Sequence, residues 1–413
     1  MSRNLRNAIQ SIRQNKLRSF LAGFGIAWGI FLLVIFLGIG NGFRSGVTDL
    51  FNGYAQKSLF VYGGVTSAST NTLNEQSQIL FDESVIRDVQ QRYGVVCACS
   101  PELSIPSLPV SFGGETTMAS IKGVSADYFR IKILDVKVGR PLEKMDDLRS
   151  RDVAVIGEGV AQSLFGKSSG IGKTFILGDA LFEVVGILSS EDLFSLQDRN
   201  SVYIPTSSFR SQFRSEGTLS SFCLSLSANA GTDEIERDLQ GYLAYRYGFD
   251  AHDESALYIA NIESQTAAFD SLFRGLEVLI WIIGVCLLLS GIVGVCNVML
   301  IIVRERTGEI GIRKAVGATS GSIISMMLSE SVLITTMAGL AGVTLGGGVV
   351  YLADKFLLPV IGGDIMGHLK IDGMTVAAAL VILCLSGVAA GLYPALKASR
   401  IVPVDAIRFE NRD

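Results

Sequence analysis

Apolar and polar positions divide the chain into four hydrophobic segments and one long mixed stretch between the first and second of them. The core of a bilayer is about 30 Å thick, and about 20 apolar residues in a helix are enough to cross it. Each hydrophobic segment reaches that length, and the four cover residues 20–43, 278–303, 323–350 and 374–396. The pattern therefore predicts a membrane protein with an α-helical transmembrane domain of four helices.

The mixed stretch, residues 44–270, has the pattern of a folded α+β domain. Strand-like runs occur at SLFVYGG (58–64), TTMASIKGV (116–124), DVAVIG (152–157), FEVVGIL (182–188) and SVYIP (201–205). Segments with a helical period lie near residues 82–92, 158–165 and 232–246. Strands and helices interleaved in this way predict a large α+β domain inserted between the first two membrane helices.

The inserted domain is large enough for two lobes, since domains commonly hold about 100–150 residues. Its two ends must be neighbours, because the chain leaves the membrane near residue 44 and re-enters it near residue 270. We therefore expect one lobe to combine residues 44–110 with 225–270. Residues 111–224 are expected to form the second lobe.

Composition agrees with a membrane protein that carries a large soluble part. Hydrophobic residues make up 49% of the chain and charged residues 18%, which is too apolar for an ordinary soluble protein. The net charge of −4, without any basic domain, argues against nucleic acid as a partner.

Lysine and arginine are distributed unevenly, and this predicts the orientation. They crowd the N-terminus, the strip after the second segment and the C-terminus, whereas the loop between the last two segments has only Lys355 and Lys370. Cytoplasmic loops carry the excess of basic residues. Both termini and the strip are therefore expected in the cytoplasm, and residues 44–270 outside.

Residues 1–19 are expected to form an amphipathic helix on the inner membrane surface. Its apolar face would comprise Leu5, Ala8, Ile9, Ile12 and Leu17. A basic tail that only sets the topology is the alternative. A cleaved signal peptide is disfavoured, because the apolar run exceeds the roughly 7–15 residues of a signal sequence and no clear A-x-A site follows it.

The strip at residues 304–319, RERTGEIGIRKAVGAT, is the most informative stretch. Its charges exclude it from the hydrocarbon, where a central charge costs at least ~2.5 kcal/mol. On a helix, Glu305, Glu309, Ile312 and Val316 share one face, and the glycines and Ala315 lie on another. The mixed acidic and apolar ridge suits a groove in a cytoplasmic partner. A solvated turn that sets topology would explain the arginines but not the glutamates.

Pairs of glycines four residues apart recur within the hydrophobic segments. Such pairs allow helices to approach closely, although apolar helices contain many by chance. We interpret them as packing positions; they are Gly25, Gly29, Gly342, Gly346, Gly387 and Gly391. Glu277 and Glu330 lie near enough to segment ends to reach lipid headgroups, and Asn297 is expected to bond a neighbouring helix.

No catalytic or metal-binding motif emerges. GKSSGIGKT (166–174) imitates a Walker A loop, but Lys167 stands where the motif needs glycine, and a strand follows instead of a helix. A glycine-rich turn is the preferred interpretation. His252 and His368 are isolated, and no H-E-x-x-H, C-x-x-C or G-x-S-x-G occurs. The chain is therefore expected to bind no cofactor or metal and not to be an enzyme.

The inserted domain contains three cysteines, Cys97, Cys99 and Cys223. An oxidising compartment could pair two of them. Because the count is odd and VVCACS is strand-like, buried free thiols are favoured over a disulfide.

Three long stretches together resemble the MacB/FtsX-type ABC transporter permeases. The strip closely resembles the family's cytoplasmic loop, with its E-R-x-x-E-I-G-x-R-K-A-x-G-A pattern, and GLYPALKASRIVPVDAIR (391–408) resembles its C-terminal end. KGVSADYFRIKILDVKVGRP (122–141) and the segments after it resemble the extracytoplasmic core domain. The resemblance covers essentially the whole chain, including the order of anchor, domain and three helices.

The resemblance implies a bacterial inner-membrane subunit whose residues 271–413 are an FtsX-like permease domain. It would form a homodimer or a heterodimer with a related permease, with a possible periplasmic adaptor or outer-membrane partner. The strip would be the helix that couples to an ATPase through Arg304, Glu305, Arg306, Glu309, Ile312, Arg313 and Lys314. The chain departs from full-length MacB in beginning almost directly with the first span, so ATP and magnesium are expected on a separate ATPase chain.

The substrate stays open at this point. Export of an amphipathic molecule such as an antibiotic or peptide, lipoprotein release and regulation of a cell-wall hydrolase all agree with the resemblance. A receptor with an extracellular ligand domain and a membrane-bound enzyme are rivals from other classes. The short cytoplasmic segments disfavour a receptor, which would be expected to carry a substantial output domain.

Overall fold

The computed structural model describes residues 16–70, 72–166, 168, 170–189, 198–213, 218–357, 369 and 373–402. The chain divides into two compact units. We call Met1–Gly46 with Ser271–Asp413 the helical unit, and Val47–Asp270 the inserted unit. Most of the amphipathic helix predicted for residues 1–19 lies outside the described residues.

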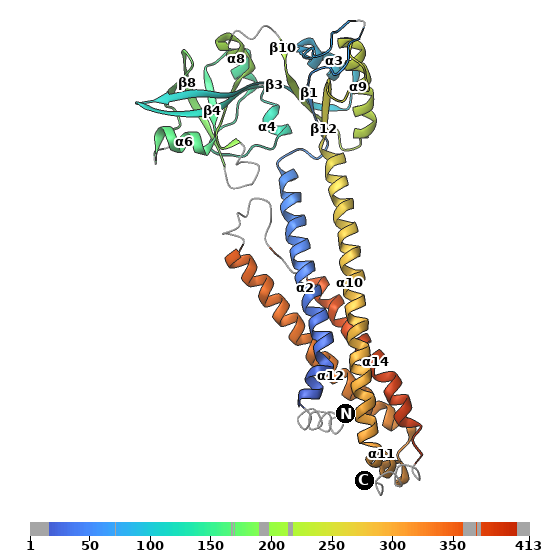
Figure 1. Cartoon of the computed structure of the whole chain (residues 1–413). Coiled ribbons are helices and arrows are strands. Elements are labelled where there is room, and N and C mark those ends of the chain that lie inside the picture. The colour runs from blue at the N-terminus through green and yellow to red at the C-terminus, as the bar shows by residue number, and fades with distance from the viewer. Residues whose placement is uncertain are drawn as a thin grey trace. The chain divides into compact units, whose positions relative to one another are not determined.

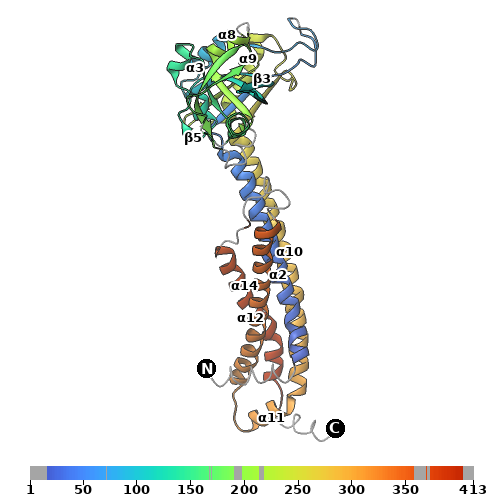
Figure 2. The ribbon, with the colours of Figure 1, turned by 90° about the vertical axis from the view of Figure 1, so that its left-hand side faces the viewer.

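Four long helices dominate the helical unit (Figures 1 and 2). They are α2 (Lys16–Asn52), α10 (Ile262–Glu305), α12 (Ser320–Leu352) and α14 (Gly373–Ser399). A short helix, α11 (Thr307–Ala315), separates α10 from α12, and a π-helical turn, Ala353–Leu357, follows α12. Each long helix is apolar and long enough to cross a membrane, which confirms the four predicted spans.

The helical unit has one hydrophobic core to which all four long helices contribute. Ile30 of α2, Met299 of α10, Met327 of α12 and Leu383 of α14 are almost fully buried in it. Many apolar side chains of α10, such as Leu289, instead face outward. Apolar residues on both the core and the outer side are expected of helices whose solvent is lipid.

The inserted unit is built on a ten-stranded sheet with the order β12-β1-β11-β3-β4-β9-β6-β8-β5, with β7 paired to β3 and β8 (Figure 1). Two of its contacts, β4 with β9 and β6 with β8, are parallel, and the others are antiparallel. The strands are β1 (Ser58–Gly63), β3 (Val96–Phe112), β4 (Glu115–Val124), β5 (Val136–Gly139), β6 (Val153–Ile156), β7 (Thr174–Leu177), β8 (Ala180–Leu188), β9 (Ser201–Pro205), β11 (Ser221–Leu226) and β12 (Leu257–Asn261). A small separate sheet pairs β2 (Phe81–Asp82) with β10 (Thr218–Leu219).

Helices of the inserted unit accompany the two ends of this sheet (Figure 1). Beside β12, β1 and β11, which we call the first half of the sheet, lie α3 (Ser84–Arg92) and α9 (Thr232–Tyr247). The second half comprises β4, β9, β6, β8, β5 and β7. Its helices are α5 (Lys144–Leu148), α6 (Glu158–Phe165) and α8 (Thr206–Phe213). A further helix, α4 (Tyr128–Ile131), contacts β3 and β11.

The five strands and three helices predicted inside residues 44–270 are confirmed, and strands from both predicted lobes belong to one sheet. β3 is 17 residues long and belongs to both halves. The boundary predicted after residue 110 falls inside β3, and the one after residue 224 falls inside β11. Sequence alternation marks where a strand lies but not which strands pair, and here pairing joins the halves into one sheet.

The sheet has a hydrophobic core on each face. Leu59 and Phe60 are neighbours on β1, yet Leu59 lies in one core and Phe60 in the other, as the alternation of a strand requires. Cys99 and Cys223 are likewise buried in opposite cores, and Cys97 is exposed. All three are free thiols, so the expectation of buried thiols holds for two of them.

Candidate functional site

The strip between α10 and α12 folds into a short helix with defined ends. Arg306 interrupts the helical path, and the Thr307 hydroxyl donates to the carbonyl oxygens of Val303 and Arg304, 3.0 and 2.8 Å away. After α11 the chain turns at Gly317, whose φ of +102° suits glycine. Thr319 then caps α12 by accepting a hydrogen bond from the Ser322 amide. The strip is thus a short helix held between two turns.

One side of α11 is buried and the other is exposed. Ile310 lies in the helical core, and Gly311 is also buried. Ile312 and Val316 have exposed fractions of 52% and 84%, and Glu309 is also exposed. We use the name α11 ridge for four exposed residues of the strip that were predicted to share one helical face; they are Glu305, Glu309, Ile312 and Val316.

Two cations of the strip turn inward and fix α11 to its neighbours. The Arg306 Nη1 lies 3.6 Å from Oε2 of Glu330 on α12. The Lys314 ammonium donates to the carbonyl oxygens of Ser399, at the end of α14, and of Ile401, the latter 3.1 Å away. Cations that bond final carbonyls also interact favourably with the negative end of a helix. These residues brace α11, whereas Arg304 and Arg313 are exposed.

The expectation that Glu330 reaches the headgroups is wrong, because only 3% of Glu330 is exposed. A carboxylate at that burial needs a cationic partner, and Arg306 supplies one from a neighbouring element. Glu277 and Asn297 lie on the exposed side of α10.

Each of the six glycines lies where a neighbouring helix comes close. A Cβ added to Gly25 would lie 3.2 Å from the Cα of Gly291 on α10. A Cβ added to Gly29 would lie 3.3 Å from the Cβ of Leu287 on the same helix. On α12, a Cβ added to Gly342 would lie 2.5 Å from the carbonyl oxygen of Ala27 on α2. A Cβ added to Gly346 would lie 3.1 Å from the carbonyl oxygen of Phe31, also on α2. A Cβ on Gly387 or Gly391 of α14 would approach side chains of α12 as closely as 2.2 and 2.7 Å. Close approach of backbones is what small residues permit at such crossings.

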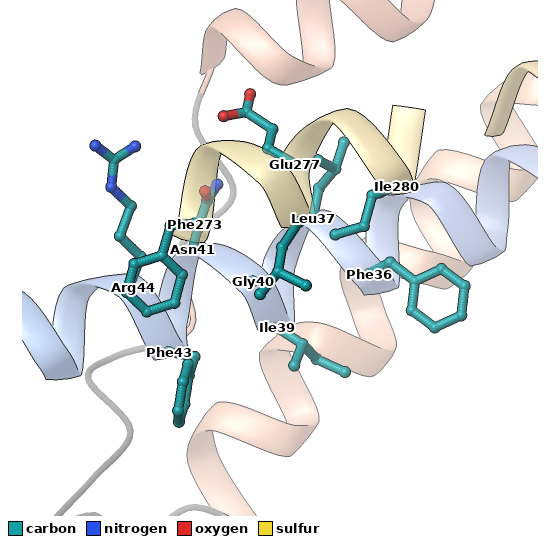
Figure 3. A pocket seen from close by; sticks show the side chains of 11 residues that line it. Phe36, Leu37, Ile39, Gly40, Asn41, Phe43, Arg44, Phe273, Glu277 and Ile280 are labelled. Carbon is teal, nitrogen blue, oxygen red and sulfur yellow. The ribbon is translucent and has the colours of Figure 1, made fainter. Parts of the chain in front are cut away.

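A pocket of about 320 Å³ lies between the paired ends of α2 and α10 within the helical unit (Figure 3). Phe36, Ile39, Phe43, Phe273 and Ile280 give it apolar walls, and polar groups come from Asn41, Arg44 and Glu277. The volume falls within the range of small-ligand pockets.

The turn that imitates a Walker A loop does not open a helix. Gly172 has a φ of +76°, and β7 begins directly afterwards at Thr174, as the sequence predicted. The Lys173 ammonium is 2.9 Å from Ser168 Oγ and lies 5.3 and 5.5 Å from the ring centroids of Phe165 and Phe112. Contacts of this kind hold the lysine against its own domain.

Among the described residues, no group of three or more histidine, cysteine, aspartate or glutamate side chains is arranged to hold a metal ion. His252 is an exposed neighbour of Asp250, and His368 lies outside the described residues.

Sequence reasoning missed a buried charge cluster in the inserted unit, formed by Glu102, Lys122, Lys132, Asp198 and Tyr203. Asp198 is 1% exposed and accepts from the Lys132 ammonium at 2.7–2.8 Å and from the Tyr203 hydroxyl. Burial, aided by the charge of Lys122, lowers the pKa of Lys132. The signal available in the sequence was a lone lysine inside the apolar strand SIKGV (120–124).

The chain has four apolar helices that are long enough to cross a membrane, with a large α+β unit inserted after the first. This is the architecture of a multi-span membrane protein that carries a folded domain between its first two spans. The model of the MacB-like periplasmic core domain matches residues 19–242, and that of the FtsX-like permease C-terminal region matches residues 281–403. The first match alone covers more than half of the chain. The chain therefore belongs to the MacB/FtsX-type family of ABC transporter permeases.

Individual relatives cover the chain almost completely. The ABC transporter permease YknZ of Bacillus subtilis is 28% identical over 98% of this chain and 99% of its own length. The macrolide export ATP-binding/permease protein MacB of Neisseria meningitidis is also 28% identical, over 97% of this chain. The chain spans 60% of the length of that MacB protein.

Two solved structures are similar to about half of the chain. The periplasmic region of MacB from Actinobacillus actinomycetemcomitans is 19% identical, with a TM-score of 0.43, over 53% of this chain and 95% of that one. The extracellular domain of YknZ is 20% identical, with a TM-score of 0.40, over 49% of this chain and 100% of that one.

Proposed function

We propose that this permease couples ATP hydrolysis on a separate cytoplasmic ATPase to movements of its inserted unit. The observation that carries the proposal is the α11 ridge, an exposed acidic and apolar surface on a helix braced to α12 and α14. A partner that displaces α11 would therefore also displace the helices to which it is fixed. Family membership implies an ATPase partner, and ATP and magnesium would be bound there.

The ATPase association is testable by reversing the charge of the α11 ridge. Glu305→Lys with Glu309→Lys should reduce co-purification of the ATPase and ATP-dependent activity by about tenfold or more, because a like charge facing a complementary surface weakens binding. The measurement is the amount of ATPase retained by the tagged permease, together with ATP turnover of the complex. Membrane insertion should be unchanged.

Glu234→Lys with Glu254→Lys is the matched control, since it makes the same change of net charge on exposed residues of the inserted unit. Association should survive in this control. Normal retention and turnover in the α11 variant would refute the assigned role of the ridge.

The proposed orientation places both termini in the cytoplasm of a bacterial cell and the inserted unit outside the inner membrane. The uneven distribution of basic residues supports it. In a cysteine-free background, Leu148→Cys should react with an impermeant maleimide in intact cells, and Glu410→Cys should react only after lysis. Leu148 is 78% exposed, so burial would not prevent labelling. Labelling of position 410 in intact cells would contradict the proposed orientation.

The substrate class that we propose is amphipathic: a peptide or antibiotic that is exported, or a lipoprotein that is released. The pocket in Figure 3 supports this class, because its apolar walls are accompanied by Arg44, Asn41 and Glu277. The name of MacB as a macrolide export protein points the same way. Regulation of a cell-wall hydrolase through the same movements is the alternative, and would use the inserted unit without the pocket.

The assembly that we propose is a dimer, either of two copies or with a related permease, joined to the ATPase. A periplasmic adaptor or outer-membrane partner would engage the inserted unit. The apolar side chains on the outer side of α10 provide a surface for a second permease copy or for lipid.

A further inference from the structure

A cavity of about 500 Å³ lies within the inserted unit, and it shares no lining residue with the pocket in Figure 3. Its walls come from α3, β3, the turn between β4 and α4, α5 and the first residue of α8. Ile86, Pro101 and Leu148 are apolar residues of this lining. Cavities of this size hold small ligands, so there is room for a molecule with a sizeable apolar part.

Hydrogen bonds and an ion pair fasten the walls of this cavity to one another. Asp147 of α5 accepts from the Ser207 amide of α8 at 2.8 Å, and the Ser207 hydroxyl donates to the Asp147 carbonyl oxygen at 2.8 Å. Arg210 of α8 pairs at 2.5 Å with Glu83, the residue before α3. Elements that are distant in the chain are thus fixed around the cavity without a ligand, as is usual for small-molecule sites.

Two carboxylates of the lining have few partners of their own. The Asp127 side chain is 17% exposed and caps no helix; the cation that pairs with it, Lys144, is 3.7 Å away and 75% exposed. Asp147 accepts from Ser207 through Oδ1, and no described residue donates to its Oδ2. Lys144 and Asp147 are three positions apart on α5, which places them on the same side of that helix. The two carboxylates therefore have one flexible, solvated cation near them.

The lining is acidic where it is covered and basic where it is exposed. Arg87 and Lys144 are both exposed, so water and salt screen their charges. The negative charge of Asp127 acts on Cys99, a buried residue of the same lining. Burial, together with that charge, raises the pKa of the Cys99 thiol to about 12. A field that disfavours a thiolate favours a cation at the same place.

Two hydroxyl groups of the lining are also without partners. The side-chain oxygens of Ser125 and Thr206 are buried and form no hydrogen bond within the described part of the chain. Thr206 is only 4% exposed. A buried polar group without a partner is unfavourable. Rotation about one bond, Cα–Cβ, redirects such a hydroxyl, so a polar ligand in the cavity can supply the missing partner.

We propose that this cavity binds an organic cation, an amine with an apolar body. The carboxylates of Asp127 and Asp147 neutralise its ammonium group and displace Lys144 toward solvent. Its apolar part contacts Ile86 and Pro101. This site goes beyond the proposed coupling function and does not depend on it.

The test is titration of the purified full chain in phosphatidylcholine nanodiscs with dansylcadaverine, a fluorescent primary amine with an apolar body. The signal of empty nanodiscs is subtracted. N-acetylated dansylcadaverine, which is uncharged, is the matched ligand. We expect saturable binding of the amine and at least about tenfold weaker binding of the acetylated form, because charge-assisted hydrogen bonds are the strong ones. This comparison uses the wild-type protein, so it holds whether or not a variant folds.

Four variants locate the bound amine. Asp127→Asn and Asp147→Asn should each weaken binding about tenfold, and asparagine at position 147 keeps an oxygen for the Ser207 amide. Lys144→Met removes the competing ammonium and should tighten binding. Asp152→Asn is the control, because it makes the same change of charge at an exposed position outside the lining, and its affinity should equal that of wild type.

Equal affinities for the amine and its acetylated form, or the absence of saturable binding, would overturn the proposal. So would wild-type affinity in both Asp127→Asn and Asp147→Asn. If Glu277→Gln abolishes binding while these two variants retain it, the amine occupies the pocket in Figure 3 and the proposed site is wrong. The titration contains no ATPase, so each of these results would leave the coupling role of the α11 ridge standing.

Discussion

Arg306→Ala is expected to release α11 from α12 and to abolish association with the ATPase. Glu330 would then be a buried carboxylate without its arginine, and removing one partner of a buried ion pair typically costs about 3–5 kcal/mol. Arg306 is partly exposed, so the lower end of this range is expected. The measurement is thermal unfolding of the purified permease, with ATPase retention assayed in parallel.

Two further variants separate loss of the brace from loss of a surface charge. Arg304→Ala removes an exposed arginine of the same strip and should change stability by no more than about 0.5 kcal/mol. Glu330→Gln in the Arg306→Ala background removes the buried charge and should recover part of the lost stability. Equal stability of the Arg304→Ala and Arg306→Ala proteins would show that the buried pair does not brace α11.

Gly342→Leu should separate α2 from α12 and lower the stability of the helical unit by about 1–3 kcal/mol or more, as overpacking does. Even a Cβ at this position would lie 2.5 Å from the Ala27 carbonyl oxygen, and a backbone atom cannot move aside as a flexible side chain can. The measurement is the unfolding temperature in nanodiscs.

Gly348 is a matched control on the same helix. A Cβ there meets nothing within 4 Å, and Gly348→Leu should be tolerated because it also removes an unfavourable helix-interior glycine. A similar fall in unfolding temperature for both variants would mean that a general effect of leucine on α12, and not the crossing with α2, is being measured.

The sequence predicted the features that depend on local pattern. Four apolar segments became four long helices, and the helical period of the strip placed Ile312 and Val316 together on an exposed face. Period and length are properties of a few neighbouring residues, so they can be read without knowing the rest of the fold.

What could not be predicted depends on pairs of residues distant in the chain. The family resemblance assigns Arg306 and Lys314 to the contact with the ATPase, but the structure gives them partners within the chain. These partners are Glu330 and the carbonyl oxygens of Ser399 and Ile401. The same holds for Lys132 and Asp198, which are 66 positions apart. Charge and spacing in a single sequence do not determine which distant groups meet. In the strip, contacts with distant groups determine which cations fix α11 to its neighbours and which remain exposed.

The pairing of β1 with β12 sets how readily this architecture can be rearranged in evolution. Leu59 and Asn261 are opposed on adjacent antiparallel strands, which lie about 4.8 Å apart. The inserted unit therefore begins and ends at almost the same point, and a gene segment encoding it can be exchanged or enlarged without changing the separation that α2 and α10 must span. Domains of different size or sequence can in this way be joined to the same two helices through the same two adjacent strands.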